Sequence, residues 1–62
     1  MCLSLVCQRK GTEELPLLEN VAKIRVDGTH LTFIDLMGRQ KEFEGSVVDM
    51  DFLENKVIVE DK

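Results

Sequence analysis

Short segments in which apolar and polar residues alternate run along the whole chain, and turn residues separate them every eight to twelve positions. Alternation with a period of two is typical of half-buried β-strands, and this spacing of turns is typical of a small sandwich or barrel. Helix signals are weak throughout. The sequence therefore predicts an all-β fold of five to six short antiparallel strands, the clearest at residues 2–9, 21–26, 30–36, 41–52 and 57–60.

Four positions determine the predicted connections. Pro16 cannot donate a ladder hydrogen bond, so residues 15–18 are expected at an edge or in an irregular connection, before a turn at Glu19-Asn20. Asp27-Gly28 favours a tight hairpin, because such a pair accepts positive φ. Gly45 lies within the longest predicted strand and indicates a bulge or a sharp coil where a barrel bends.

The same alternation predicts which side chains form the core. Phe43 is expected in the core, and the inward parity is expected to switch after Gly45. The apolar sets are Leu3, Leu5 and Cys7 on one face of the first strand, Ala22, Ile24 and Val26 inward in the second, and Val48, Met50 and Phe52 beyond Gly45. Because an open sheet of this size would leave unpaired edges, the strands are expected to close on themselves.

The chain has 62 residues without an internal repeat, linker or low-complexity run, so residues 1–62 are predicted to form a single domain. A chain this short buries only about 60% of the surface that its unfolded form exposes, so self-association would add stability. The two Cys residues do not make a disulfide framework. With neither a signal peptide nor a stretch of about 20 apolar residues, the protein is expected to be cytoplasmic, away from membranes, with reduced thiols.

Charge and motifs argue against several functions. Twelve Asp and Glu against eight Lys and Arg give a net charge of −4, which disfavours partners bound chiefly through phosphates. Because no phosphate-binding loop, nucleophile triad or carboxylate pair on an evident cleft is recognisable, the chain is predicted not to be an enzyme. The acidic pairs lack the pattern of a calcium loop and are expected to solvate strand faces: Glu13-Glu14, Asp49/Asp51 and Glu60-Asp61.

The first two residues, Met1-Cys2, carry the most distinctive chemistry. The Met1 amine, the deprotonated backbone nitrogen of Cys2 and the Cys2 thiolate can chelate one metal ion through five-membered rings. Nitrogen and sulfur donors in a plane suit square-planar Ni(II) or Cu(II), and a thiolate also suits Zn(II) and Cu(I). If Met1 is removed, the Cys2 amine and thiolate still form a two-donor chelate. The alternative is that Cys2 is only a small apolar side chain.

The other candidate ligands are weaker. On one extended strand, Cys7 would lie about 16 Å from Cys2 at roughly 3.3 Å per residue, so the two thiols can neither share a metal within one chain nor form a disulfide. Cys7 is expected in the core, since a free Cys is often fully buried. His30 follows a turn and has no Cys or His partner at metal-site spacing, so it is expected to be exposed without a special role.

Donor counting suggests a dimeric site. One chain supplies at most three donors near Cys2, whereas a closed square plane has four. A symmetric homodimer whose N-termini meet near the two-fold axis would supply two thiolates and two nitrogens to one ion. The sequence thus gives a hypothesis of one ion per dimer.

Several segments together resemble the CooT family of small nickel-binding proteins, over nearly the whole chain. They are Met1-Cys2-Leu3, Glu19-Asn20-Val21, Ile24-Arg25-Val26-Asp27-Gly28, Leu36-Met37-Gly38, Lys41-Glu42-Phe43-Glu44-Gly45 and Val57-Ile58-Val59. The resemblance implies an SH3-like β-barrel that dimerises and binds Ni(II) through its N-terminal Cys, which corresponds to Cys2. It further implies an accessory role, supplying nickel to the nickel-dependent carbon monoxide dehydrogenase or its maturation proteins.

Two alternative functions are also considered from the sequence. Some relatives have been labelled RNA-binding on fold grounds, but such a module needs basic grooves and exposed aromatic platforms. This chain is acidic and has three Phe, no Tyr and no Trp, and its Phe residues are expected in the core. The second alternative is a protein-interaction domain with incidental metal affinity.

Overall fold

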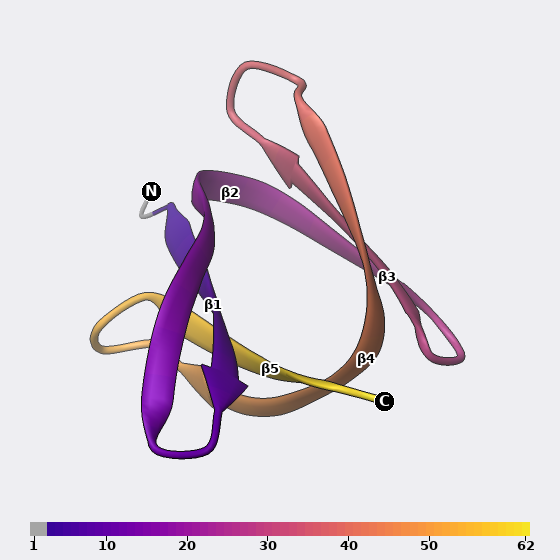
Figure 1. The fold of residues 1–62 in the computed structure, drawn as a ribbon. Coiled ribbons are helices and arrows are strands. Elements are labelled where there is room, and N and C mark those ends of the chain that lie inside the picture. The colour runs from indigo at the N-terminus through magenta and orange to yellow at the C-terminus, as the bar shows by residue number, and fades with distance from the viewer. Residues whose placement is uncertain (1–2) are drawn as a thin grey trace.

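The structure, a computed structural model, describes residues 3–62 as a ring of five strands. They are β1 (Ser4–Lys10), β2 (Glu13–Asp27), β3 (His30–Asp35), β4 (Gln40–Asp51) and β5 (Lys56–Asp61). Each strand pairs with the next, and β5 returns to β1, so the sheet closes into a barrel (Figure 1). The predicted all-β barrel is confirmed, with five strands. Residues 3–62 include no helix that could cross a membrane.

The pair that closes the barrel, β1 with β5, is parallel, whereas the four other pairs are antiparallel. Five strands that alternate in direction leave the first and the last pointing the same way, so the odd strand number requires this arrangement. Both edges of β5 are paired, and its three central residues, Val57, Ile58 and Val59, are all buried. A continuous buried run is typical of a strand covered on both faces.

β2 differs from the prediction because it continues through Pro16 and Asn20 as one long strand. Asn20 has a φ of 57°, a left-handed conformation that Asn tolerates better than most residues. The strand therefore bends at the point where the sequence predicted a turn. The half before the bend pairs only with β1, and the half after it pairs with β3, from Val21 opposite Asp35 to Asp27 opposite His30. Pro16 lies in the first half, which has one edge without a strand partner within residues 3–62, in agreement with its expected edge position.

β4 runs unbroken through Gly45, and its bulge lies further along the strand. The register with β5 shifts between Val47 and Asp49, so the bulge is at Val48. Gly45 has a different role, because a Cβ atom at this position would collide with the backbone oxygen of Glu60 and the ring of Phe43. The absence of a side chain allows β5 to approach closely.

The core is built from Val, Leu, Ile and Phe side chains of all five strands. Its buried members are Val6, Val21, Leu31, Phe33, Val57 and Val59, with Leu17, Leu18, Ile24, Phe43 and Val47 packed against them. Phe33 is fully buried, and its ring centroid lies 6.5 Å from that of Phe43. Cys7 is also buried, as predicted.

Several other predicted inward positions are wrong. Val26, Met50 and Phe52 have exposed fractions of 61%, 57% and 80%. Ile24 packs against the core as predicted, but Val21 and Val47 do so as well, because the register shifts at Ala22 in β2 and at Val48, rather than at Gly45, in β4. Ala22 and Val48 are exposed as well. In β1, the neighbours Val6 and Cys7 are both buried, because register shifts on both sides of Val6 break the alternation.

A buried carboxylate organises the turn between β3 and β4. Asp35 Oδ1 accepts hydrogen bonds from the backbone N–H groups of Met37 (2.9 Å) and Arg39 (2.8 Å), and Oδ2 lies 2.7 Å from Arg39 Nε. Burial opposes ionisation of Asp35, but the bonds from Arg39 and Met37 outweigh it and hold the pKa of the carboxyl below its ordinary value. This arrangement fixes Arg39 at the start of β4.

Candidate functional site

Met1 and Cys2, the predicted metal ligands, lie outside the described residues. The structure does describe the chain directly after them. Ser4 opens β1 opposite Val21, and Leu5 N donates a hydrogen bond to Asn55 O at 2.9 Å. The start of β1 is thus held between β2 and the turn that joins β4 to β5. Leu3 and Ser4 line a shallow hollow whose other residues include two acids, Glu19 and Glu54.

An apolar surface begins beside Ser4 and crosses the barrel. Five residues form this surface, which we call the apolar face: Ala22, Ile24 and Val26 of β2, Met50 of β4, and Phe52 just after β4. Two adjoining hollows of about 380 and 240 Å³ run along it, and Ser4 lines the second. The strand edges on either side, residues 23–27 and 46–51, have no further strand partner within residues 3–62.

The remaining thiol, Cys7, does not present a metal ligand. Its side chain is buried in the barrel wall, and burial raises the pKa of the thiol. Metal binding requires the thiolate, which this environment disfavours. The structure confirms the expectation that Cys7 is a core residue.

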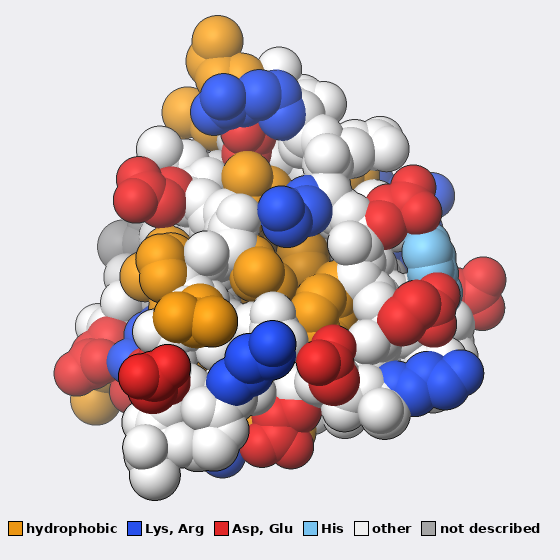
Figure 2. Space-filling view, viewed as in Figure 1, with side chains coloured by type: hydrophobic (Ala, Val, Ile, Leu, Met, Phe, Trp, Pro, Cys, Tyr) orange, Lys and Arg blue, Asp and Glu red, His pale blue; other side chains and the backbone are white. Residues whose placement is uncertain are grey.

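His30 lies between two carboxylates across the β3–β4 ladder. Its Nδ1 is 2.7 Å from Glu44 Oε1, and its Nε2 is 3.1 Å from Glu42 Oε1. In Figure 2 the imidazole is seen among acidic side chains at the edge of the molecule. These contacts, first of all the hydrogen bond to Glu44, raise the pKa of His30. Both ring nitrogens are occupied. This cluster was not predicted from the sequence, because His30 and Glu44 become direct partners only once the hairpin register is known.

Residues 3–62 contain no group of three or more His, Cys, Asp or Glu side chains placed to hold a metal ion.

The three Phe residues differ from the expectation that all lie in the core. Phe33 is buried and Phe43 half-buried, whereas Phe52 is exposed on the apolar face. The described part of the chain therefore offers one exposed aromatic ring, instead of the row of platforms used by single-strand RNA binders.

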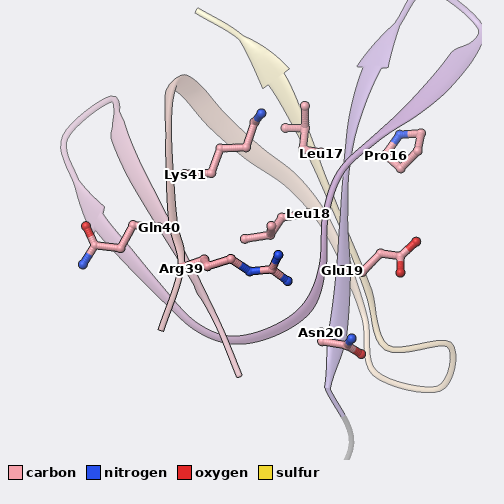
Figure 3. A pocket seen from close by; sticks show the side chains of 8 residues that line it. All are labelled: Pro16, Leu17, Leu18, Glu19, Asn20, Arg39, Gln40 and Lys41. Atoms are coloured by element: carbon pink, nitrogen blue, oxygen red, sulfur yellow. The ribbon is translucent and has the colours of Figure 1, made fainter. Parts of the chain in front are cut away.

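A second surface feature was not foreseen from the sequence. An open groove of about 580 Å³ separates the first half of β2 from the beginning of β4, and we call it the basic groove. Its lining residues are Pro16, Leu17, Leu18, Glu19 and Asn20 on one wall, and Arg39, Gln40 and Lys41 on the other (Figure 3). Two cations therefore face this groove and only one acid does, in a chain that carries a net charge of −4.

The fold defines a class of small closed β-barrels to which a solved CooT structure also belongs. The crystal structure of a Carboxydothermus hydrogenoformans protein assigned to CooT is similar to this one with a TM-score of 0.91, at 18% sequence identity, over 98% of each chain. This likeness confirms the barrel fold.

The chain belongs to the CooT family, whose members are described as CO dehydrogenase accessory proteins, and the family match spans residues 1–60. It is also similar to an uncharacterized protein of Archaeoglobus fulgidus, with 37% identity over 43 residues, which cover 69% of this chain and 96% of that protein. The family resemblance noted in the sequence is therefore confirmed, and with it an accessory role in the CO dehydrogenase system.

Proposed function

We propose that this protein carries Ni(II) to a nickel-dependent CO dehydrogenase or its maturation proteins, in the cytoplasm. In this proposal the ion is bound by the Cys2 thiolate and by the adjacent nitrogens, the Met1 amine and the Cys2 amide. The observation that carries the proposal is the position of a Met-Cys pair at the start of a segment that matches the CooT family. Thiolate and amide nitrogen are donors that square-planar Ni(II) prefers.

The properties of the other candidate ligands support the assignment to Cys2. Cys7 is buried and its thiol pKa is raised, and His30 has both nitrogens engaged by carboxylates. A nickel ion that is bound through sulfur at neutral pH therefore has one suitable thiol, that of Cys2. A site near the chain terminus also suits delivery, since the ligands of an acceptor protein can replace its donors one at a time.

The apolar face supports a homodimer as the working form. Exposed apolar side chains that are contiguous and adjoin free strand edges often mark protein interfaces. Ser4 lies at the rim of this face, and Cys2 is two residues away, at most about 7 Å along an extended chain. A second copy docked on the apolar face would bring the two Cys2 thiols toward the same axis. Each chain would then supply its Cys2 thiolate and one of the two adjacent nitrogens, so that two thiolates and two nitrogens bind one ion per dimer.

Calorimetric titration with Ni(II) tests the ligand assignment. The unmodified chain should bind Ni(II) tightly, and Cys2→Ser should abolish tight binding while the circular dichroism spectrum stays that of the folded barrel. Cys7→Ser serves as the matched control because it removes the other thiol, and it should keep the affinity wherever it remains folded. Unchanged nickel affinity in Cys2→Ser would refute the proposal.

Native mass spectrometry tests the dimeric site separately. The saturated protein should appear as a dimer with one nickel ion. A ratio of one ion per chain would contradict the shared site, even if Cys2 proves to be a ligand.

A further inference from the structure

The first half of β4 has one backbone edge without a strand partner in residues 3–62. Asp35 N donates to Arg39 O at 2.9 Å, and Gly45 N donates to Thr29 O at 2.8 Å. At both ends of the β3–β4 ladder the residues that bond toward β3 are thus odd-numbered, Arg39 directly before β4 and Gly45 within it. Because ladder bonds alternate along an antiparallel pair, Gln40, Glu42 and Glu44 direct their backbone N–H and C=O groups away from β3.

No other described strand covers this edge. The pairing of β4 with β5 begins only at Gly45, and the first part of the edge before it, Gln40 and Lys41, borders the basic groove. On the opposite wall, β2 pairs only with β1 before its bend, and Pro16 has no N–H group to offer. An extended row of free backbone groups is a template for an added strand, so the β4 edge is the more suitable of the two.

The groove has a charge opposite to that of the molecule as a whole. Arg39 extends across it toward β2, with its Nε engaged by Asp35 (Figure 3). The remaining guanidinium nitrogens form no ion pair within residues 3–62, and neither does Lys41. Leu17 and Leu18 make part of the β2 wall apolar, and both pack against the core. Two available cations beside free backbone groups favour a ligand that combines a peptide backbone with carboxylates.

We propose that the β4 edge accepts an extended acidic segment of a partner protein, which adds as a strand beside Gln40–Glu44. Its groove-facing side chains would be Asp or Glu and would reach Lys41 and Arg39. Its outward-facing side chains would lie beside Glu42 and Glu44 and would therefore be neutral or basic. Main-chain hydrogen bonds supply the attachment in this mode of recognition, and the alternate side chains supply the specificity.

Amide hydrogen exchange measured by NMR tests the strand addition. The probe is the blocked peptide acetyl-Glu-Thr-Glu-Thr-Glu-Thr-amide, added to the ¹⁵N-labelled chain. We expect exchange of the Glu42 and Glu44 amides to slow, because these groups point at the free edge. The amides of Lys41 and Phe43 already bond to β3, so they should change little. The same peptide with Lys in place of Glu should have no effect.

Lys41→Gln should weaken binding of the acidic peptide about two- to fivefold, as expected for one partly exposed ion pair. Lys10→Gln is the matched control, because it makes the same charge change on an exposed residue at the far end of β1. Cys2→Ser should bind the peptide normally, so a failure of the nickel proposal leaves this one intact.

Three results would overturn the proposal. The first is unchanged exchange at Glu42 and Glu44 in saturating peptide. The second is an equal response to N-acetylglutamate amide, which would show binding of a carboxylate alone. The third is protection that rises with protein concentration without peptide, which would show that a second copy covers the edge.

Discussion

At the scale of single residues, the carboxylates around His30 make the stability of the fold depend on pH. The pKa of His30 is raised above 6.5, so its contribution is complete below that value and is lost as the pH rises through the higher folded-state pKa. The pKa of Glu44 is lowered from 4.5, chiefly by the hydrogen bond with His30, so its contribution is lost as the pH falls through the lower value. The pair therefore stabilises the barrel most between these limits.

We predict that His30→Gln flattens this dependence. The urea midpoint of the unmodified chain should be highest in weakly acidic solution and should fall as the pH rises above neutrality. The variant should lose most of that fall, because the group that titrates there is gone. Thr32→Ser, a mild change on the same strand, should keep the full pH profile. If His30→Gln and the unmodified chain gave parallel profiles, the ion pair would have no part in the pH dependence.

Gly45 provides a second test at the residue scale. Gly45→Ala should destabilise the fold by about 1–3 kcal/mol, because the new methyl group collides with the Glu60 backbone and the Phe43 ring. At roughly 4–8 °C per kcal/mol for a domain of this size, calorimetric melting would detect the change. Ser46→Ala, at the exposed neighbouring position, should alter the melting temperature little. An unchanged melting temperature in Gly45→Ala would show that β5 does not approach as closely as described.

At the scale of elements, the strands were largely predictable, and the exceptions have local causes. The hairpin at Asp27-Gly28 and the extent of β4 followed from alternation and turn residues. The continuity of β2 did not, because the left-handed conformation of Asn20 replaces a turn with a bend. After Asn20, Ile24 packs against the core as predicted, whereas Ala22 and Val26 are exposed. In β4 the alternation alone could not locate the bulge, which lies at Val48 and not at Gly45.

The apolar face lies between two strand edges, residues 23–27 of β2 and 46–51 of β4, that have no further strand partner within residues 3–62. Val26, Met50 and Phe52, which the sequence predicted to point inward, are exposed there. We predict that Phe52→Ser shifts the dimer toward monomer in sedimentation velocity, because it removes the largest apolar side chain of the face. Leu53→Ser is the control. Leu53 is 96% exposed and lines neither hollow, so its replacement should leave the association unchanged. Equal effects of the two variants would contradict the assignment of this face to the interface.

At the scale of the whole molecule, some candidate functional residues could be predicted from the sequence, and others could be found only from the structure. The sequence predicted Met1 and Cys2 as ligands and correctly placed Cys7 in the core. It could not reveal the His30 cluster or the basic groove, because both depend on which strands become neighbours. The barrel holds the start of β1 at the rim of the apolar face. In the proposed dimer, the N-termini of two copies would meet there.

The most direct test of a sulfur-bound nickel carrier is the absorption spectrum recorded during Ni(II) titration. The account predicts a thiolate-to-nickel charge-transfer band that grows until one ion is bound per dimer. The band should persist in a folded Cys7→Ser variant and disappear in Cys2→Ser. Nickel binding without this band in the unmodified chain, or a band that survives in Cys2→Ser, would contradict the central claim.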